Sequence, residues 1–311
     1  TSKQAAATAK DNLLRVYVSA NSTATEEKKD FAGAWKATSP ENTMKFTAVG
    51  YEFAKVLREK LDVPVGIIEC SWGGKPVESF ISDEAIKVLP EGKVVVDKKA
   101  QAVRKYNPEK AKKHYEVNLK KWKLADAEWK KTKKGNRPRK PKMQSDPELN
   151  PSLHSTIYNA MIAPIAGYSA KGAIWYQGES NANGGTDKVY GELLECMIQD
   201  WRKRWGSNLS FYYVQLANYN ARTSESWVMV QDEMRRLLDD PDMQDGNIGM
   251  ATITDIGTPK NIHPPNKKDV GARLARWALN QDYGKKDVVV SGPLYESHKV
   301  AGNAIELTFE F

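Results

Sequence analysis

The chain has 311 residues, of which 40% are hydrophobic, including nine Trp and thirteen Tyr. This length suits one large α/β domain or two smaller ones, and the composition excludes global disorder. No stretch approaches the roughly 20 apolar residues of a membrane-spanning helix. Residues 1–10 lack a signal-peptide pattern, which says little about export because the chain does not begin with Met.

The positive charge is concentrated in one segment. The net charge is +8, but residues 93–142 contain 19 Lys and Arg against 5 Asp and Glu, a local charge of +14. Since +8 minus +14 is −6, the rest of the chain is acidic. A basic patch can bind a nucleic acid or another anionic polymer, but we favour a solvated helical face.

Hydrophobic periodicity predicts strands and helices that alternate along most of the chain. The predicted strands are 13–19, 63–70, 172–176, 210–217 and 248–254, and the predicted helices are 47–61, 188–205, 226–238 and 266–279. Such alternation predicts an α/β fold with a mainly parallel sheet that is covered by helices on both faces. In sheets of this kind the chemistry lies in loops after the carboxyl ends of strands.

One segment interrupts this alternation. Residues 97–129 predict a long charged helical stretch with a thin apolar seam, and residues 130–151, rich in Lys, Arg and Pro, predict an extended surface excursion. We interpret residues 91 to 146 as a basic helical insertion within a single domain that spans residues 1–311.

The two cysteines lie in apolar surroundings. Cys70 follows Ile67-Ile68-Glu69, and Cys196 lies within Leu193-Leu194-Glu195-Cys196-Met197. We expect two buried free thiols, with a single disulfide as the alternative. Their number and spacing do not indicate a metal site, and we expect no cofactor.

Three predicted strand ends carry unusual loops. In the first, Trp72 precedes Gly73 and Gly74, whose backbone amides can approach a ligand closely, although a tight turn explains the glycines equally well. The second loop, residues 175–182, brings Gln, Glu, Ser and Asn together beside a buried strand, which is costly unless these groups bind something.

The third loop, residues 255–266, contains His263 between a strand end and a helix start. Two prolines follow His263 and fix the backbone there. A histidine held in this way suits general-base catalysis, although a lone loop histidine is more often an ordinary loop residue. The other three histidines, His114, His154 and His298, have no comparable setting.

Together the three loops resemble the signature blocks of the sialate O-acetylesterase family. The resemblance rests on Val63-Pro64-Val65-Gly66-Ile67-Ile68 with Ser71-Trp72-Gly73-Gly74, on Ile174-Trp175-Tyr176-Gln177-Gly178-Glu179-Ser180-Asn181-Ala182, and on Ile262-His263-Pro264-Pro265-Asn266-Lys267. It implies an SGNH-type hydrolase with a three-layer flavodoxin-like fold, a serine–histidine mechanism and an acetylated sugar or polysaccharide as substrate. It also implies a periplasmic or extracellular location, with no nucleic acid or membrane as partner.

The sequence departs from the family pattern at two points. The family's Gly-Gln-Ser-Asn block, which holds the nucleophile, is absent, so we expect the serine upstream of this chain; the alternative is an inactive relative. The family often has Asp two residues before the histidine, where this chain has Asn261. We therefore expect Asp255 to orient His263, or a backbone carbonyl to do so less efficiently.

The resemblance also assigns roles to the loop residues. We expect the amide of Gly73 or Gly74 and the side-chain amide of Gln177 to stabilise the oxyanion. The same substrate-binding set includes Gly178. Glu179 and Asn181 would hold the loop or contact the sugar, and Trp72 would form a wall of the site.

Three other interpretations compete with the esterase. Ser180 in Gly178-Glu179-Ser180 partly matches a nucleophile elbow, but the fifth residue is Ala182 where the motif requires Gly. A non-catalytic carbohydrate-binding relative is the main alternative, because the serine is absent and Trp and Tyr are abundant. Nucleic-acid binding through residues 93–142 is disfavoured, because the aromatic residues there have helical spacing.

Overall fold

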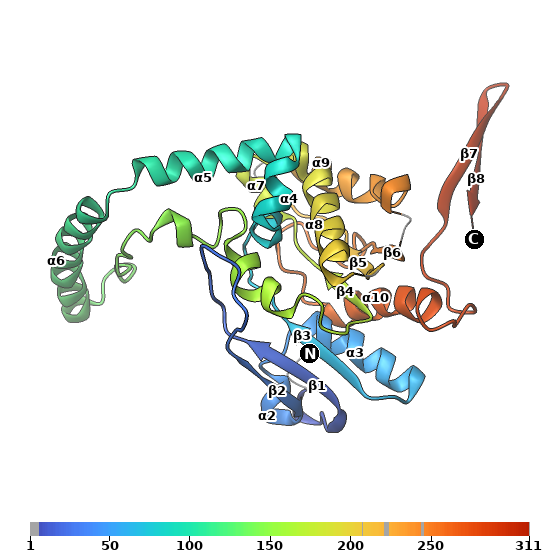
Figure 1. Ribbon diagram of the computed structural model, residues 1–311, viewed down its shortest axis with the longest axis horizontal. Helices are drawn as coiled ribbons and strands as arrows, with labels where there is room; N and C mark the ends of the chain where they lie inside the picture. Colours follow the sequence, from blue (N-terminus) through green and yellow to red (C-terminus); the bar gives the residue numbers. More distant parts are fainter. Residues whose placement is uncertain (1–5, 207, 221–223, 244–245, 311) are drawn as a thin grey trace.

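The computed structural model describes residues 6–206, 208–220, 224–243 and 246–310 (Figure 1). Its strands are β1 (Asp11–Ser19), β2 (Gly33–Thr38), β3 (Val65–Glu69), β4 (Gly172–Trp175), β5 (Ser210–Val214), β6 (Ile248–Ala251), β7 (Leu294–Ala301) and β8 (Ala304–Glu310). Its α-helices include α2 (Pro40–Thr43), α3 (Ala48–Leu61), α4 (Asp83–Val88), α5 (Lys93–Lys105), α6 (Pro108–Thr132), α7 (Glu179–Gly184), α8 (Tyr190–Trp205), α9 (Ser224–Arg236) and α10 (Lys267–Gln281).

The strands form two three-stranded sheets and a separate hairpin. In the first sheet, of order β2-β1-β3, β1 is parallel to β3 and antiparallel to β2. In the second, of order β4-β5-β6, all strands are parallel. The prediction of a mixed α/β fold with a parallel sheet is confirmed, whereas β2 and the β7–β8 hairpin were not predicted.

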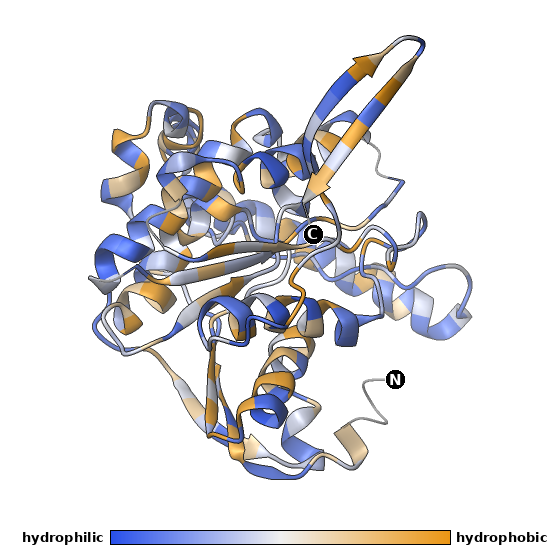
Figure 2. Ribbon diagram, turned by 90° about the vertical axis from the view of Figure 1, so that its right-hand side faces the viewer, coloured by the Kyte–Doolittle hydropathy of each residue, from blue (hydrophilic) through white to orange (hydrophobic). Residues whose placement is uncertain are grey.

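Strand β5 shows why the second sheet is covered on both faces (Figure 2). Every residue of β5 is buried, and successive side chains point to opposite faces. Phe211 and Tyr213 pack in the core cluster that contains the apolar faces of α8 and α9. Tyr212 and Val214 pack in a second cluster with the apolar faces of α3 and α10. The continuous apolar run predicted for this strand therefore reflects burial on both sides.

The segment 97–129 forms two helices where the sequence suggested one helical stretch. Helix α5 ends at Lys105 and α6 begins at Pro108. Proline lacks the N–H that a continuous helix would need and disfavours a helical residue before it. The side chain of Asn107 accepts a hydrogen bond from Lys110 N–H and so caps the new helix.

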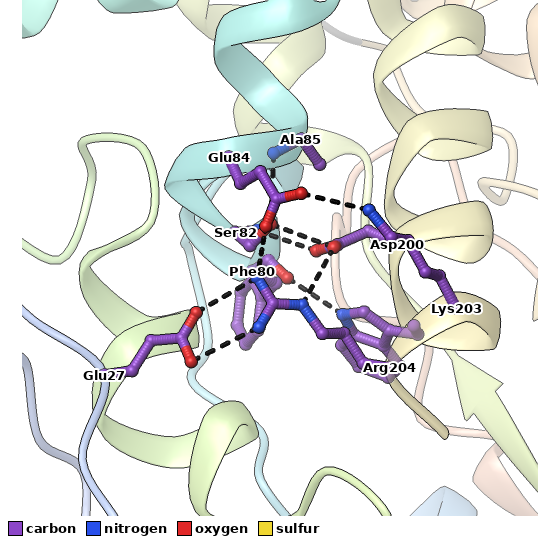
Figure 3. A network of polar contacts seen from close by, with 9 residues as sticks. Glu27, Phe80, Ser82, Glu84, Ala85, Asp200, Lys203 and Arg204 are labelled. Atoms are coloured by element: carbon purple, nitrogen blue, oxygen red, sulfur yellow. Dashed lines mark hydrogen bonds and ion pairs between the residues drawn. The ribbon is translucent and has the colours of Figure 1, made fainter. Parts of the chain in front are cut away.

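A polar network fixes the chain that follows the first loop against α8 (Figure 3). The buried carboxylate of Asp200 accepts hydrogen bonds from the backbone N–H and the hydroxyl of Ser82, at 2.8 and 2.9 Å. Arg204, one turn further along α8, forms ion pairs with Glu27 and Glu84. These contacts hold the start of α4, and therefore the segment before it, at a defined place beside α8.

Both cysteines are free, as the favoured prediction required, but each is half-buried where full burial was expected. Burial raises the pKa of each thiol to about 12, with nearby carboxylates adding to the effect. Both thiols are therefore protonated near neutral pH. Among the described residues, no helix is both long and apolar enough to cross a membrane.

Candidate active site

The three loops singled out in the sequence follow β3, β4 and β6, and side-chain contacts join them. The N–H of Val77, just after the first loop, donates to Asn181 Oδ1 in the second loop at 3.1 Å. Lys267, just after the third loop, has its Nζ 4.7 Å from the centroid of the Tyr176 ring in the second. The second loop therefore lies between the other two.

Asn181 is the hub of a buried hydrogen-bond network. Its Oδ1 accepts from Val77 N–H and from Gln177 Nε2, at 3.1 and 2.6 Å. Its Nδ2 donates to Glu78 Oε2 and to Thr186 Oγ1, each at 2.9 Å. These four bonds use the full capacity of the amide, and the side chain has no solvent exposure. The amide of Asn181 therefore joins the segment after the first loop to the second loop.

Gln177 is drawn into the same network. One of its Nε2 hydrogens goes to Asn181, and the Tyr190 hydroxyl donates to its side-chain and backbone oxygens, at 3.2 Å each. The amide group is thereby held in one orientation. Because an amide nitrogen carries two hydrogens, one N–H of Gln177 is left over from these bonds.

Glu78 is a buried carboxylate that the sequence analysis did not single out. It is 2% exposed and belongs to a short 3₁₀ helix, Val77–Phe80. Burial raises the pKa of its carboxyl, while hydrogen bonds, including the one from Asn181, and the charge of Lys98 lower it in part. The only sequence signal was its position four residues after Gly74, which did not distinguish it from an ordinary loop residue.

Gly178 has a backbone that other residues rarely adopt. Its φ is +147°, and an added Cβ would lie 3.0 Å from Met234 Cε and 3.2 Å from the methyl carbons of Leu216. A side chain here would strain the backbone and collide with the core. Gly178 therefore shapes the turn that leads from β4 into α7.

Glu179 connects the second loop with the third. Burial raises the pKa of its carboxyl, and the nearby His263 and Lys267 lower it in part. Burial also lowers the pKa of the Lys267 ammonium, which the Glu179 charge opposes. The histidine predicted from the third loop thus lies within electrostatic reach of the second loop.

His263 is exposed, and its backbone is fixed from both sides. Its N–H donates to Asn261 Oδ1 at 3.0 Å, and the proline that follows it is buried. Asn261, which occupies the position where the family often has Asp, therefore holds the histidine's backbone. The imidazole itself is on the surface and accessible to a further group.

Asp255 is engaged elsewhere. Both of its carboxylate oxygens accept hydrogen bonds from Arg273, at 2.6 Å each, and this bidentate ion pair lowers the pKa of the carboxyl. No hydrogen bond to the His263 ring is found for it in the described part of the chain. The structure therefore brings His263 toward Glu179 and pairs Asp255 with a residue of α10.

The first loop leaves its glycine backbone open. Gly73 and Gly74 are exposed, and no atom lies within 4 Å of a Cβ added to either. Gly74 has a φ of +71°, which favours glycine. Trp72 is half-buried against the core, with Lys75 Nζ 5.7 Å from its ring centroid.

A cavity of about 190 Å³ lies where the first and second loops meet. Gly74 and Ser180 line it from these two loops, and Glu78 and Lys98 line it from the adjacent segments. Among the described residues, no group of three or more His, Cys, Asp or Glu side chains is placed to hold a metal ion. The side chains at the three loops include amides, carboxylates, hydroxyls and one accessible imidazole.

Comparisons with known proteins agree with the resemblance seen in the motifs. A family model described as carbohydrate esterase, sialic acid-specific acetylesterase, matches residues 142–279, which include the second and third loops. Sialate O-acetylesterase from Rattus norvegicus is 27% identical over 316 residues, covering 94% of this chain and 55% of that protein. The Homo sapiens enzyme of the same name is 28% identical over 265 residues, covering 80% of this chain and 42% of that protein.

A solved structure is also similar. A carbohydrate acetylesterase from Xanthomonas citri superposes with a TM-score of 0.74 and 30% sequence identity, covering 99% of this chain and 57% of that one. The chain thus spans about half the length of the curated relatives that it matches.

Proposed function

Because this chain is a relative of the sialate O-acetylesterases, we propose that it supplies most of the active site of a carbohydrate O-acetylesterase. The enzyme hydrolyses acetyl esters on sialic acid or on other acetylated glycans. The observation that supports this most is that the second loop is linked to the residues that follow both other loops. Asn181 accepts a hydrogen bond from Val77 N–H, and the Nζ of Lys267 lies over the Tyr176 ring. Acyl transfer needs such convergence, because base and oxyanion donors must face one carbonyl.

The finer expectations form part of the same proposal. The chain is a single domain of the SGNH type, with a three-layer flavodoxin-like arrangement and a basic helical insertion at about 91–146. The protein is a secreted deacetylase of the periplasm or the extracellular space. The similarity to the Xanthomonas citri acetylesterase over 99% of the chain is consistent with these expectations.

In the proposed mechanism His263 is the general base. It takes the proton of a serine hydroxyl, which attacks the acetyl carbonyl and forms a tetrahedral intermediate. Collapse expels the sugar oxygen, which receives the proton back from His263. Water, deprotonated by the same histidine, then hydrolyses the acyl-enzyme to acetate. The serine is expected upstream of this chain, and the exposed imidazole is open to it.

The oxyanion donors are the open backbone amides of Gly73 or Gly74 and the remaining N–H of Gln177. The hydrogen bonds of Gln177 to Asn181 and Tyr190 fix its amide in advance, so that no reorganisation is needed as charge develops. Loss of one such donor costs about 3 kcal/mol of transition-state stabilisation.

Asp255 stays the predicted orienting acid of His263. Its bidentate pair with Arg273 has to open before it can serve the imidazole. If the pair stays closed, a backbone carbonyl has to orient the ring. Replacing Asp255 by Asn distinguishes the two arrangements.

The test is acetate release by the full-length protein from a panel of O-acetylated sialic acids and polysaccharides. We expect release by the full-length protein, whereas the 311-residue chain alone does not hydrolyse p-nitrophenyl acetate. Trapping an acyl group on Ser71 or Ser180 of the 311-residue chain would overturn the proposed nucleophile. Binding of acetylated glycans without acetate release would instead identify the alternative, a non-catalytic carbohydrate-binding relative.

A further inference from the structure

The basic segment extends away from the sheets as an arm (Figure 1). We define the basic arm as residues 93–142, which comprise α5, α6 and the returning chain 133–142. It carries the local charge of +14 counted above, and α6 lies at its far end.

One face of α6, here called the inner face, packs against the returning chain 133–142. Trp122 Nε1 donates to Pro138 O and Trp129 Nε1 donates to Gly135 O, each at 3.0 Å. Lys140 Nζ lies 5.9 Å from the Trp122 ring centroid, and Lys133 Nζ lies 4.7 Å from that of Trp129. The two tryptophans of α6 therefore hold the returning chain and do not form an open stacking platform.

The outer face of α6 carries a stripe of lysines and exposed apolar side chains. The stripe consists of Lys113, Val117, Lys120, Leu124 and Lys131. At 100° per residue these positions fall within a sector of about 60°, and at 1.5 Å per residue they extend over about 27 Å. Val117 is 52% exposed and Leu124 is 75% exposed.

The lysines of the stripe have no partner on the arm. The buried carboxylate of Asp126 is taken by Lys130 and Arg137, at 2.9 and 2.7 Å, and its pKa is held well below its usual range. None of the ion pairs between described residues involves Lys113, Lys120 or Lys131. Their ammonium groups therefore face solvent without an ion-pair partner in the described part of the chain.

Side chains at the base of the arm line two cavities beside the candidate active site. Lys98 of α5 lines the cavity of about 190 Å³ together with Gly74 and Ser180. Lys188 and Lys93, the latter paired with Asp97 at 2.6 Å, line a neighbouring cavity of about 500 Å³ between α5 and the chain after α7. Positive side chains thus occur both at the tip of the arm and next to the site.

We propose that the outer stripe of the basic arm binds an acidic polysaccharide, a polymer of sugar rings with regularly spaced carboxylates, and holds it beside the active site. This inference rests on the proposed function, because it names the substrate class of that site. Lysines at intervals along about 27 Å match a polymer with repeated charges, and the exposed Val and Leu match the apolar faces of sugar rings. Single-stranded nucleic acid would need a platform of open aromatic side chains, and the two tryptophans of α6 are engaged with the returning chain.

The experiment measures binding of the full-length protein to polygalacturonate, with dextran as a neutral polymer, by affinity electrophoresis at several salt concentrations. The test variant combines Lys113→Gln, Lys120→Gln and Lys131→Gln, and glutamine preserves the helix propensity of lysine. The matched control combines Lys29→Gln, Lys60→Gln and Lys286→Gln, which removes three charges from exposed positions elsewhere. Circular dichroism of each variant verifies that the helix content of the protein is unchanged.

We expect the protein to bind polygalacturonate in a salt-sensitive manner and not to bind dextran. The stripe variant should bind at least about tenfold more weakly, and the control should change by less than about twofold. Equal weakening by the control variant overturns the proposal, as does tighter binding to a DNA duplex or to anionic lipid vesicles than to polygalacturonate. Because polygalacturonate carries no acetyl ester, a protein without esterase activity still gives a clear result.

Discussion

Replacing Asn181 by Asp tests the buried network that joins the first two loops. The substitution keeps the shape of the side chain but exchanges the Nδ2 donor for a carboxylate oxygen. In the structure Asn181 Nδ2 lies 2.9 Å from Glu78 Oε2. The variant therefore places two carboxylates in contact at a site where both side chains are almost fully buried.

The size of the effect follows from this contact. Two negative charges about 4 Å apart repel by about 4 kcal/mol at an effective dielectric constant of 20, so the pair takes up a proton instead. Holding a proton near pH 7 on a carboxyl with an ordinary pKa of about 4.3 costs about 3.5 kcal/mol. The cost falls to about 1 kcal/mol near pH 5. The carboxyl pair has a raised pKa in the folded state, so the folded Asn181→Asp variant loses stability as the pH rises.

The assay is the free energy of unfolding in urea for the wild type, Asn181→Asp, Glu78→Gln and the double variant, near pH 5 and near pH 7. In the double variant the new amide at position 78 can donate to the new carboxylate at position 181. The reversed pair should therefore recover about 2–3 kcal/mol at the higher pH. An Asn181→Asp variant that is equally destabilised at both pH values would refute the reasoning. So would a double variant no more stable than Asn181→Asp.

Three further predictions concern other parts of the chain. Asp255→Asn should lower kcat of the full-length protein by less than about tenfold if the pair with Arg273 stays closed; a loss near 10⁴-fold would identify Asp255 as the orienting acid. Gly178→Ala should destabilise the fold by about 1–3 kcal/mol in urea unfolding, because of its φ and its contact with Met234. Gly184→Ala, with no atom within 4 Å of the new Cβ, is the control, and equal losses would contradict the argument. His154 is buried, and its pKa is lowered from 6.5 to about 4 by burial, with the Lys99 charge adding to this effect. Stability should therefore fall by up to about 3 kcal/mol as pH drops from about 6.5 to about 4, since only the unfolded chain gains the proton. The His154→Leu variant should lack this slope in urea unfolding, and a slope that persists in it would show that other groups cause it.

The sheet could be predicted because burial leaves a direct mark on the sequence. The continuous apolar run of β5 and the apolar faces of α8 and α10 agree with their positions in the structure. The break before Pro108 was visible in the sequence but was outweighed by the helical composition on both sides. Strand β2 was not found because most of its residues are exposed, so burial left no alternating pattern.

The candidate site could be predicted only where strand ends identify it. His263 and the second loop follow predicted strands, and the rule for parallel sheets brings them to one edge. The hydrogen bond between Glu78 and Asn181 joins residues 103 positions apart, and no local pattern marks a buried carboxylate. Likewise, the pair of Asp255 with Arg273 depends on how α10 packs, so the sequence alone did not reveal this use of the carboxylate.

The most direct test of the central claim is acetate release by the full-length protein carrying His263→Ala. His263 is exposed, and among the described hydrogen bonds its contact runs through the backbone N–H, so the variant should melt at the wild-type temperature. The account predicts that acetate release from an O-acetylated glycan falls by about 10²–10⁴-fold. Acetate release at the wild-type rate, with the fold intact, would contradict the assignment of His263 as the base.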